Sequence, residues 1–452
     1  MKSIIKNVKQ TIVEIGQVLL GRDASDHTTR HLVKGTSGTF GLNVLVNITL
    51  FITSIVLARL LGATGYGTYM YAIVWATLLS VPAGMGMGRI LIRNVASYQA
   101  QSAWGLISGQ LRWADRVVLA ASLIIVILAI VTIWLLRNHI STETIHSLWL
   151  AVIILPATTL MRLRQSTMQG LHRVIIGQLP EALVQPLILI VLVGISYFLL
   201  EEYINALWVI GLNVIATSMA FLVSVYLLYK IVPHKIKHAE PVYDNQTWLR
   251  SGLAMMLMTA LNIINSRADI LMLGAMTNSE SVGIYNIAVR GGELITFLMI
   301  AVHASLGPTI AKLYTNKDIE RLQRVITKST RIVFSLSLPV GLGLIFFGYW
   351  FLLIFGPDFT QGKYALAILS AGQIFNVFMG PVALILIMTH HERDAAIGLG
   401  ISAILNITLN ALLIPQWGLE GAATATAVSM VLWNILMAMM IYRKIRIYSV
   451  AI

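Results

Sequence analysis

Residues 117–136 read VVLAASLIIVILAIVTIWLL, a run of twenty residues without a charged side chain that lies between Arg116 and Arg137. A helix of about 20 mainly apolar residues has the length that crosses the hydrocarbon core of a bilayer. A helix on the surface of a soluble protein needs a polar face, and this run has none. Residues 117–136 therefore predict a membrane-spanning helix, and similar stretches recur along the chain.

The composition of the whole chain supports the same fold class. Of the 452 residues, 57% are hydrophobic and 11% are charged, whereas about 25% of the residues in a typical soluble domain are charged. So little polar material cannot cover the surface of a soluble protein. We therefore predict an all-α polytopic membrane protein. The chain has no cysteine, which excludes disulfides and thiolate metal sites.

Twelve stretches have the length and apolar content of a spanning helix. The fourth is the weakest of them, because it is short and contains Pro156. No remaining segment is long enough to form a separate soluble domain, so the sequence predicts that the protein is not an enzyme. The predicted spans are 38–60, 66–88, 116–137, 145–163, 175–199, 204–230, 250–275, 281–306, 330–355, 363–389, 395–414 and 419–442.

The basic residues predict how these spans are oriented. Lys and Arg accumulate in the cytoplasmic loops of membrane proteins. Most of the 32 Lys and Arg residues fall in the N-terminal arm and in alternate loops, whereas the intervening loops contain Arg137 and Lys363. This pattern predicts that both termini lie in the cytoplasm. The net charge of +13 then reflects topology, and it does not predict binding to nucleic acid.

The segment between the sixth and seventh spans predicts a linker. Residues 230–250 contain Pro233 and Pro241, and proline interrupts regular helices. The chain is thereby divided into two groups of six spans. The predicted parts are a basic cytoplasmic arm at 1–35, an N-terminal six-helix bundle at 36–231, a cytoplasmic linker at 232–249, a C-terminal six-helix bundle at 250–445 and a cytoplasmic tail at 446–452.

A short sequence echo relates the two groups. Residues 61–69 read LGATGYGTY, and in the second group LGA at 273–275 is followed by VGIY at 282–285. Six spans in each group give both groups the same orientation, as in transporters built from parallel repeats around a central site. The sequence therefore predicts two pseudo-symmetric bundles, although an echo this short can also arise by chance.

Polar side chains within the predicted spans are candidates for a cavity lining. Such groups are costly in hydrocarbon and usually face a cavity or a neighbouring helix. For the asparagines the alternative role is hydrogen bonding between helices without any transport, and Arg59 can also extend to the membrane interface. The predicted substrate-binding or cavity residues are Arg290, Asn47, Asn43, Asn262, Asn265, Asn286 and Arg59.

Three acidic residues within the spans are candidates for ion coupling. They are Asp269, Glu293 and Glu181. Asp269 can instead neutralise Arg290, and Glu181, which is alone in its span between two prolines, can either titrate or support a bend. The sequence predicts no cofactor and no metal site, and it lacks the glycine-rich motif of ATP hydrolysis. Coupling to H⁺ or Na⁺ remains open.

Three runs of sequence resemble a known family. TSIVLARLLG at 53–62, followed by GYGTY at 65–69, resembles the opening of bacterial polysaccharide flippases. These form the O-antigen and capsule branch of the multidrug/oligosaccharidyl-lipid/polysaccharide exporter superfamily. DILMLG at 269–274 and GLEGAA at 418–423 resemble the start of the second half and the penultimate loop of that family. The resemblance covers nearly all of residues 36–445, and its motifs are mostly structural.

The resemblance implies a MATE-like fold with twelve transmembrane helices in two six-helix bundles that work by alternating access. It implies transport of polyprenyl-diphosphate-linked oligosaccharide to the outer leaflet of the inner membrane, for O-antigen or other lipopolysaccharide and surface polysaccharide. Asn47, Asp269 and Arg290 would face the cavity, with Arg59 near its exit. Cavities in the family are typically basic, whereas these spans hold equal numbers of Arg and acidic residues.

The resemblance also implies partners and leaves alternatives. Membrane lipids, a polysaccharide polymerase and glycosyltransferases are the expected partners besides the lipid-linked oligosaccharide. The alternative function is a multidrug or organic-cation antiporter of the same superfamily, in which Glu181, Asp269 or Glu293 exchanges substrate against protons or sodium. A third alternative is a membrane scaffold that transports nothing. Neither the glycan nor the coupling ion follows from the sequence.

Overall fold

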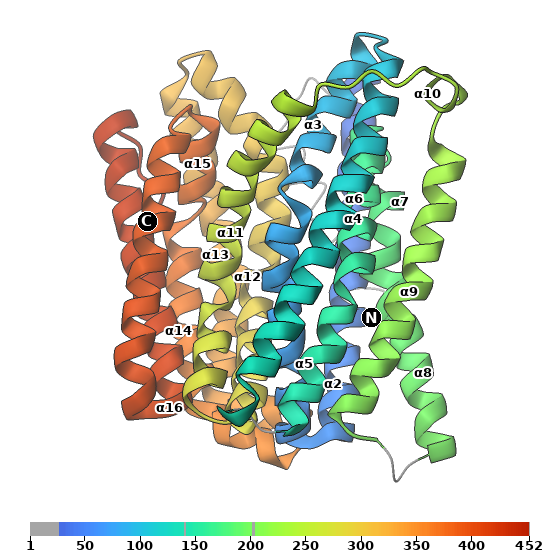
Figure 1. Ribbon diagram of the computed structural model, residues 1–452. Coiled ribbons are helices and arrows are strands. Elements are labelled where there is room, and N and C mark those ends of the chain that lie inside the picture. Colours follow the sequence, from blue (N-terminus) through green and yellow to red (C-terminus); the bar gives the residue numbers. More distant parts are fainter. Residues whose placement is uncertain (1–26, 140–141, 201–203, 452) are drawn as a thin grey trace.

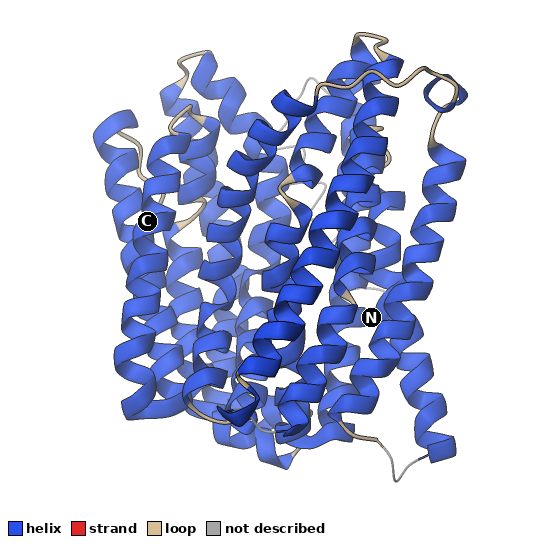
Figure 2. Cartoon of the chain, viewed as in Figure 1, coloured by secondary structure: helices blue, strands red, loops and turns tan. Residues whose placement is uncertain are grey.

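The computed structural model describes residues 27–139, 142–200 and 204–451, so most of the predicted N-terminal arm and Ile452 lie outside the described residues. Within these ranges the chain is helical and contains no strand (Figure 2). The long helices run side by side, as expected for a bundle that spans a membrane (Figure 1). The prediction of an all-α fold is confirmed.

The elements follow one another along the chain with short connections. They are α2 (His27–Gly84), α3 (Met87–Ala100), α4 (Trp104–Leu135), η1 (Arg137–His139), α5 (Thr142–Ile153), α6 (Leu155–Gly170), α7 (Val174–Leu179), η2 (Pro180–Val184), α8 (Gln185–Leu200), α9 (Ala206–Ile231), α10 (His234–Lys237), α11 (Asn245–Met276), α12 (Ser279–Thr315), α13 (Ile319–Leu353), η4 (Pro357–Gly362), α14 (Lys363–Met379), α15 (Val382–Met388) and α16 (Glu392–Ile445). Of these, η1 and η4 are 3-10 helices and η2 is a π-helical turn.

Ten helical stretches among the described residues are long and apolar enough to cross a membrane, so this is a multi-pass membrane protein. Two of them, Gly41–Gly84 with 44 residues and Glu392–Ile445 with 54, are about twice the length that one crossing requires. Each is interrupted at a glycine with left-handed backbone, Gly62 (φ 65°) and Gly418 (φ 56°). Because glycine has no Cβ, it adopts this conformation readily, and the helix kinks there.

The fourth span departs from its prediction. The sequence predicted a single span at 145–163, but α5 ends at Ile153 and α6 continues to Gly170. Pro156 lies in the first turn of α6, where the missing proline N–H costs no helical hydrogen bond. The proline therefore starts a new helix, and Arg162 lies in the middle of that helix instead of at the end of a span.

Local sequence signals fix where several helices begin. The side chain of Asn205 accepts a hydrogen bond from the N–H of Trp208 at 2.9 Å, and Asn278 does the same for Ser281 at 2.9 Å. Asp318 accepts one from Arg321 at 3.1 Å. Such N-caps satisfy backbone donors that have no partner within the helix. They set the starts of α9, α12 and α13.

Helices from the two parts of the chain meet along α2. The helices of residues 27–231 gather on the right in Figure 1 and those from α13 onward gather on the left, with α11 and α12 between them. Helix α2 packs along α12 and α11, and α3 packs against α11. The contact is closest at Gly67 and Gly283, because a Cβ on either residue would overlap the backbone of the other helix. These two glycines belong to the sequence echo.

The end of this interface near Gly62 is closed by aromatic and polar contacts. Phe51 packs edge-on against Phe355 with ring centres 5.4 Å apart, and Tyr66 packs against Phe359 at 6.0 Å. Arg59 donates from Nε to the carbonyl oxygen of Ile354, at 2.7 Å. We call this closed region the Gly62 end.

The predicted linker and tail are both packed onto helices. In the linker, the N–H of Val242 donates to the carbonyl oxygen of Gly105 at 3.0 Å, which ties it to the start of α4. In the tail, Gln323 of α13 binds both the N–H and the carbonyl oxygen of Tyr448, each at 2.8 Å. Ser449 of the tail is buried.

Candidate functional site

A cavity of about 370 Å³ lies between α2, α3, α6 and α11, on the opposite side of the Gly67–Gly283 contact from the Gly62 end. One wall is a single face of α6, because residues three and four positions apart share a helix face. The other walls come from the end of α2, the start of α3 and the middle of α11, so both parts of the chain contribute. The polar α6 residues that line the cavity are Thr159, Arg162, Gln165, Ser166 and Gln169.

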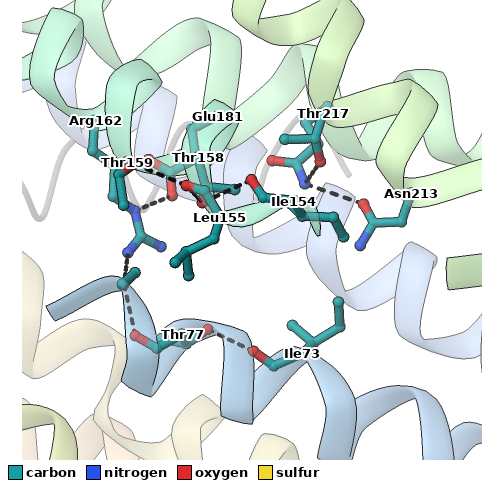
Figure 3. Close-up of polar contacts among 12 residues, drawn as sticks. Ile73, Thr77, Ile154, Leu155, Thr158, Thr159, Arg162, Glu181, Asn213 and Thr217 are labelled. Carbon is teal, nitrogen blue, oxygen red and sulfur yellow. Dashed lines mark hydrogen bonds and ion pairs between the residues drawn. The ribbon is translucent and has the colours of Figure 1, made fainter. Parts of the chain in front are cut away.

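An ion pair lies at the edge of the cavity. The Nε of Arg162 donates to Oε1 of Glu181 at 2.8 Å, and Nη1 donates to Oγ of Ser80 at 3.1 Å. Ser80 in turn donates to the carbonyl oxygen of Thr77 at 2.6 Å. Figure 3 shows the guanidinium between the carboxylate of Glu181 and the segment of α2 that carries Thr77. Helices α2 and α6 and the turn η2 are thus joined at one arginine.

The approach of Glu181 to Arg162 depends on a glycine and a proline. A Cβ on Gly177 would lie 3.1 Å from the carbonyl oxygen of Gln165, so α7 packs almost directly on the backbone of α6. One turn later Pro180 begins the π-helical turn η2, which carries Glu181. Such turns inside helices occur frequently at functional sites. The local geometry therefore presents this carboxylate to α6.

The cavity lining is cationic. Two arginines, Arg89 and Arg162, and one acidic residue, Glu181, line it. Among the described residues, no ion pair or side-chain hydrogen bond engages Arg89, which is exposed. Guanidinium groups bind phosphate through paired N–H donors, and the amides and hydroxyls of α6 suit sugar hydroxyls. The lining can accept a ligand that combines phosphate with polar groups.

A polar network lies in the first half of the chain (residues 36–231), next to the turn that carries Glu181. Gln185 donates from Nε2 to Oγ1 of Thr217 at 2.9 Å and to Oδ1 of Asn213 at 3.2 Å. Asn213 donates to the hydroxyl of Tyr69 at 3.3 Å. Figure 3 shows Asn213 and Thr217 close to the π-helical turn. The network fixes the end of that turn to α9 and α2.

The second half contains a matching network with an acid in it. Tyr285 donates to Oδ2 of Asp269 at 2.7 Å and lies 3.2 Å from Oγ1 of Thr426. Asn406 reaches the same threonine at 3.5 Å, and the N–H of Ile270 donates to Oδ1 of Asp269 at 2.8 Å. Tyr285 occupies the place in the sequence echo that Tyr69 occupies in the first half. Each network therefore contains the tyrosine that ends its own echo motif, Tyr69 in the first half and Tyr285 in the second.

The residues predicted from the sequence are distributed over several places. Arg290 pairs with Glu293 of its own helix at 3.4 Å, and the contacts of Asp269 described above do not include Arg290. Asn286 accepts a hydrogen bond from Tyr66 of α2 at 3.2 Å, which links the two halves. The remaining predicted residues contact their own helices or the Gly62 end.

The side chains of these remaining residues bind backbone carbonyl groups or make no hydrogen bond among the described residues. Asn47 and Asn262 each donate to the carbonyl oxygen four residues earlier, both at 2.8 Å. Arg59 binds the carbonyl of Ile354. Within the part of the chain that the structure describes, no hydrogen bond involves the side chains of Asn43 or Asn265. Of all the predicted site residues, Glu181 lines the cavity described above.

Glu181 also differs from its prediction, since it is not alone. Its partner Arg162 was not selected from the sequence, because the fourth span was predicted to end at residue 163. The signal was present in the sequence: polar residues recur at 162, 165, 166 and 169 with the period of a helix. No group of three or more His, Cys, Asp and Glu side chains that could hold a metal ion occurs among the described residues.

Solved structures of related fold cover most of the chain. An inward-facing MATE family multidrug transporter of the MOP superfamily has a TM-score of 0.73 and 13% sequence identity, over 90% of this chain and 98% of that one. The lipid II flippase MurJ, in an inward closed conformation, has a TM-score of 0.70 and 16% identity, over 89% of this chain and 87% of its own. The fold is MATE-like, as predicted.

Sequence comparison also finds relatives of the chain. A probable flippase, AglR, from Haloferax volcanii is 30% identical over 172 residues, which is 37% of this chain and 36% of the relative. A probable low-salt glycan biosynthesis flippase, Agl15, from the same organism is 28% identical over 171 residues, which is 38% of this chain and 36% of the relative. These matches span about a third of each relative.

Two family models also match the chain. The MatE model matches residues 253–412. The model described as polysaccharide biosynthesis protein matches residues 32–314, which is more than half of the chain and includes both echo motifs and the whole α6 face of the cavity. The chain therefore belongs to the polysaccharide biosynthesis protein family.

Proposed function

We propose that this protein is a flippase that moves a polyprenyl-diphosphate-linked oligosaccharide from the inner to the outer leaflet of the inner membrane. The observation that carries the proposal is the cavity between the two halves, with Arg89 and Arg162 for the diphosphate and a polar face of α6 for the sugars. The two Haloferax relatives described as probable flippases support it. The protein would move its substrate without chemical change, for use in surface polysaccharide biosynthesis.

We infer that the chain crosses the membrane twelve times, in bundles formed by residues 36–231 and 250–445. The interruptions at Gly62 and Gly418 support this count, because each divides one over-long helix into two lengths suited to a bilayer. An even count and the basic arm favour cytoplasmic termini. The Gly62 end would then face outward and the cavity would face the cytoplasm.

The proposed transport cycle starts from this inward-facing arrangement. A diphosphate from the inner leaflet would bind the guanidinium groups while the Gly62 end stays closed. Alternating access then requires the contacts of Arg59 with Ile354 and of Phe51 with Phe355 to separate, so that the cavity opens outward. Membrane lipids surround the protein, and glycosyltransferases and a polymerase would act before and after it. We expect the transport cycle to require no cofactor.

Asp269 is the group best suited to couple an ion to this cycle. Its carboxylate is buried at the junction of α11, α12 and α16, where Tyr285 and Thr426 hold it. Ionisable groups at such depth commonly bind the coupling cation of a transporter. H⁺ and Na⁺ are both compatible with this set of oxygen ligands. Arg290, Glu293 and the asparagines of α2 and α11 remain candidates for contacts in other states of the cycle.

Replacing Arg162 tests the proposed function. We expect Arg162→Gln to abolish surface polysaccharide in cells that depend on this protein, while the variant still inserts in normal amounts. Arg164→Gln is the matched control, because Arg164 is on the same helix and pairs with Asp115 away from the cavity. Normal polysaccharide with Arg162→Gln at native expression would contradict the proposal.

A cation antiporter is the second candidate, and the buried carboxylate of Asp269 favours it. An antiporter would protect a pump-deficient host against toxic organic cations, and Asp269→Asn would remove that protection. The flippase proposal predicts no protection by either protein. A susceptibility assay therefore separates the two functions.

A further inference from the structure

The arginine that faces the cavity is only partly engaged by the protein. Arg162 uses one N–H on Nε for Glu181 and one on Nη1 for Ser80. A guanidinium has five N–H donors, so three of them have no partner among the described residues. Its side chain is 43% exposed, and it lines the cavity. These donors form the edge that a phosphate would occupy.

The carboxylate of Glu181, beside Arg162, is held by a single hydrogen bond among the described residues. Glu181 accepts from Arg162 through Oε1, and no hydrogen bond to Oε2 is found in the described ranges. It lies on the π-helical turn η2, whose far end is tied to α9 by Gln185. Moving the carboxylate away from Arg162 therefore leaves the anchor of the turn intact. It is also the single acidic side chain in the described lining of the cavity.

A phosphate on Arg162 would be a second anion beside Glu181 at one guanidinium. An anion on the Nη edge of Arg162 would lie close to the carboxylate on Nε, and the two like charges would repel each other. Binding of the phosphate therefore favours departure of the Glu181 carboxylate from Arg162.

We propose that Glu181 is a competitor built into the cavity: its carboxylate occupies Arg162 in the empty protein, and the phosphate of the substrate displaces it. This inference rests on the proposed function and adds the residue that sets the affinity of the site. The competitor keeps Arg162 paired when no substrate is bound. It also returns to Arg162 when the substrate leaves, and thereby speeds release.

Binding of a defined anionic lipid tests the inference. The probe is radiolabelled geranylgeranyl diphosphate, bound at equilibrium to the purified full-length protein in detergent, with uncharged geranylgeraniol for comparison. We expect Glu181→Gln to bind the diphosphate about tenfold more tightly, since one hydrogen bond to a charged group corresponds to at least that factor. Geranylgeraniol binding should not change. In proteoliposomes the same variant should transport more slowly, because release becomes limiting.

Two further variants make the test specific. In the double variant Arg162→Gln/Glu181→Gln, the gain from Glu181→Gln should vanish, since the two residues act through one interaction. Asp115→Asn, which removes an equivalent acid from Arg164 outside the cavity, should leave binding unchanged. A gain that persists without Arg162, or that Asp115→Asn reproduces, would show a general charge effect and overturn the inference.

The outcomes for the inference and for the proposed function differ. If the unmodified protein does not prefer geranylgeranyl diphosphate over geranylgeraniol, the proposed function fails. If it does and Glu181→Gln binds equally or more weakly, the competitor role fails and the flippase proposal stands. A gain in affinity that depends on Arg162 supports both.

Discussion

At Asp269 a carboxylate lies in the apolar interior of the second half, where only a few polar groups surround it. The hydroxyl of Tyr285 and the N–H of Ile270 approach its two oxygens at 2.7 and 2.8 Å. Buried polar groups are costly unless they are hydrogen-bonded. In the matching network of the first half, Tyr69 binds an amide instead of an acid. The hydrogen bond of Tyr285 should therefore contribute more to the stability of the fold than that of Tyr69.

This difference gives a prediction about stability. We expect Tyr285→Phe to lower the stability of the protein by about 1.5–3 kcal/mol, because a buried acid loses its closest donor. Tyr69→Phe should cost about 1 kcal/mol, because the lost bond joins neutral groups. Thermal unfolding of both variants in the same detergent measures the order. A larger loss for Tyr69→Phe would contradict this account of the networks.

The residues of the cavity were only partly predictable. Glu181 could be selected from the sequence because an acid within an apolar span is unusual. Arg162 was missed despite the helical period of the polar residues at 162, 165, 166 and 169, because charge rules place arginines near span ends in loops and do not show which side of a helix end they face. The pairing of Arg162 with Glu181 depends on the close packing at Gly177, which spacing along the chain does not give.

At the scale of helices, the long apolar runs were the reliable signal. Residues 117–136 and similar runs predicted spanning helices that the structure contains, since length and hydropathy decide whether a helix can cross a bilayer. The start of α4 and the end of α6 were missed, because these helices continue as polar turns beyond the apolar part. The π-helical turn was not predicted, since it depends on how Pro180 packs between neighbours.

The crossing of α2 and α12 gives a prediction at this scale. We expect Gly67→Ala to prevent normal packing of the two halves, because its Cβ would overlap the backbone of Ser279 and Gly283. Gly41→Ala on the same helix meets no atom within 4 Å and should be tolerated. The amount of folded protein in a fluorescence-detected gel filtration profile measures both effects. Equal profiles for the two variants would show that α12 can move aside at little cost.

For the whole molecule, the closed Gly62 end implies a measurable difference in access. The chain has no cysteine, so a single introduced thiol can be followed without background. Ala63 is buried at this end, where its carbonyl faces Gly283. We expect Ala63→Cys to react slowly with an impermeant maleimide added outside intact cells.

Removing the Arg59 contact should change that rate. Arg59→Gln loses the bond to the carbonyl of Ile354, and we expect the thiol at position 63 to react several-fold faster, because the outward-open state becomes more populated. Arg137→Gln in η1, where the guanidinium lies over Trp134, serves as the control. Unchanged labelling would mean that Arg59 does not hold the two halves together.

The ion pair of Arg162 also has a consequence for biosynthesis. An arginine within a membrane-spanning segment raises the free energy of insertion, by about 2.5–3.5 kcal/mol at the bilayer centre and by less towards the interface. Arg164 finds Asp115 on α4, which precedes it in the chain, whereas Glu181 follows Arg162 by 19 residues. Helix α6 therefore reaches the translocon before Glu181 does. We expect the cost of inserting Arg162 to fall when Glu181 arrives on the α7–η2 segment, so that α6 enters the bilayer most favourably together with that segment.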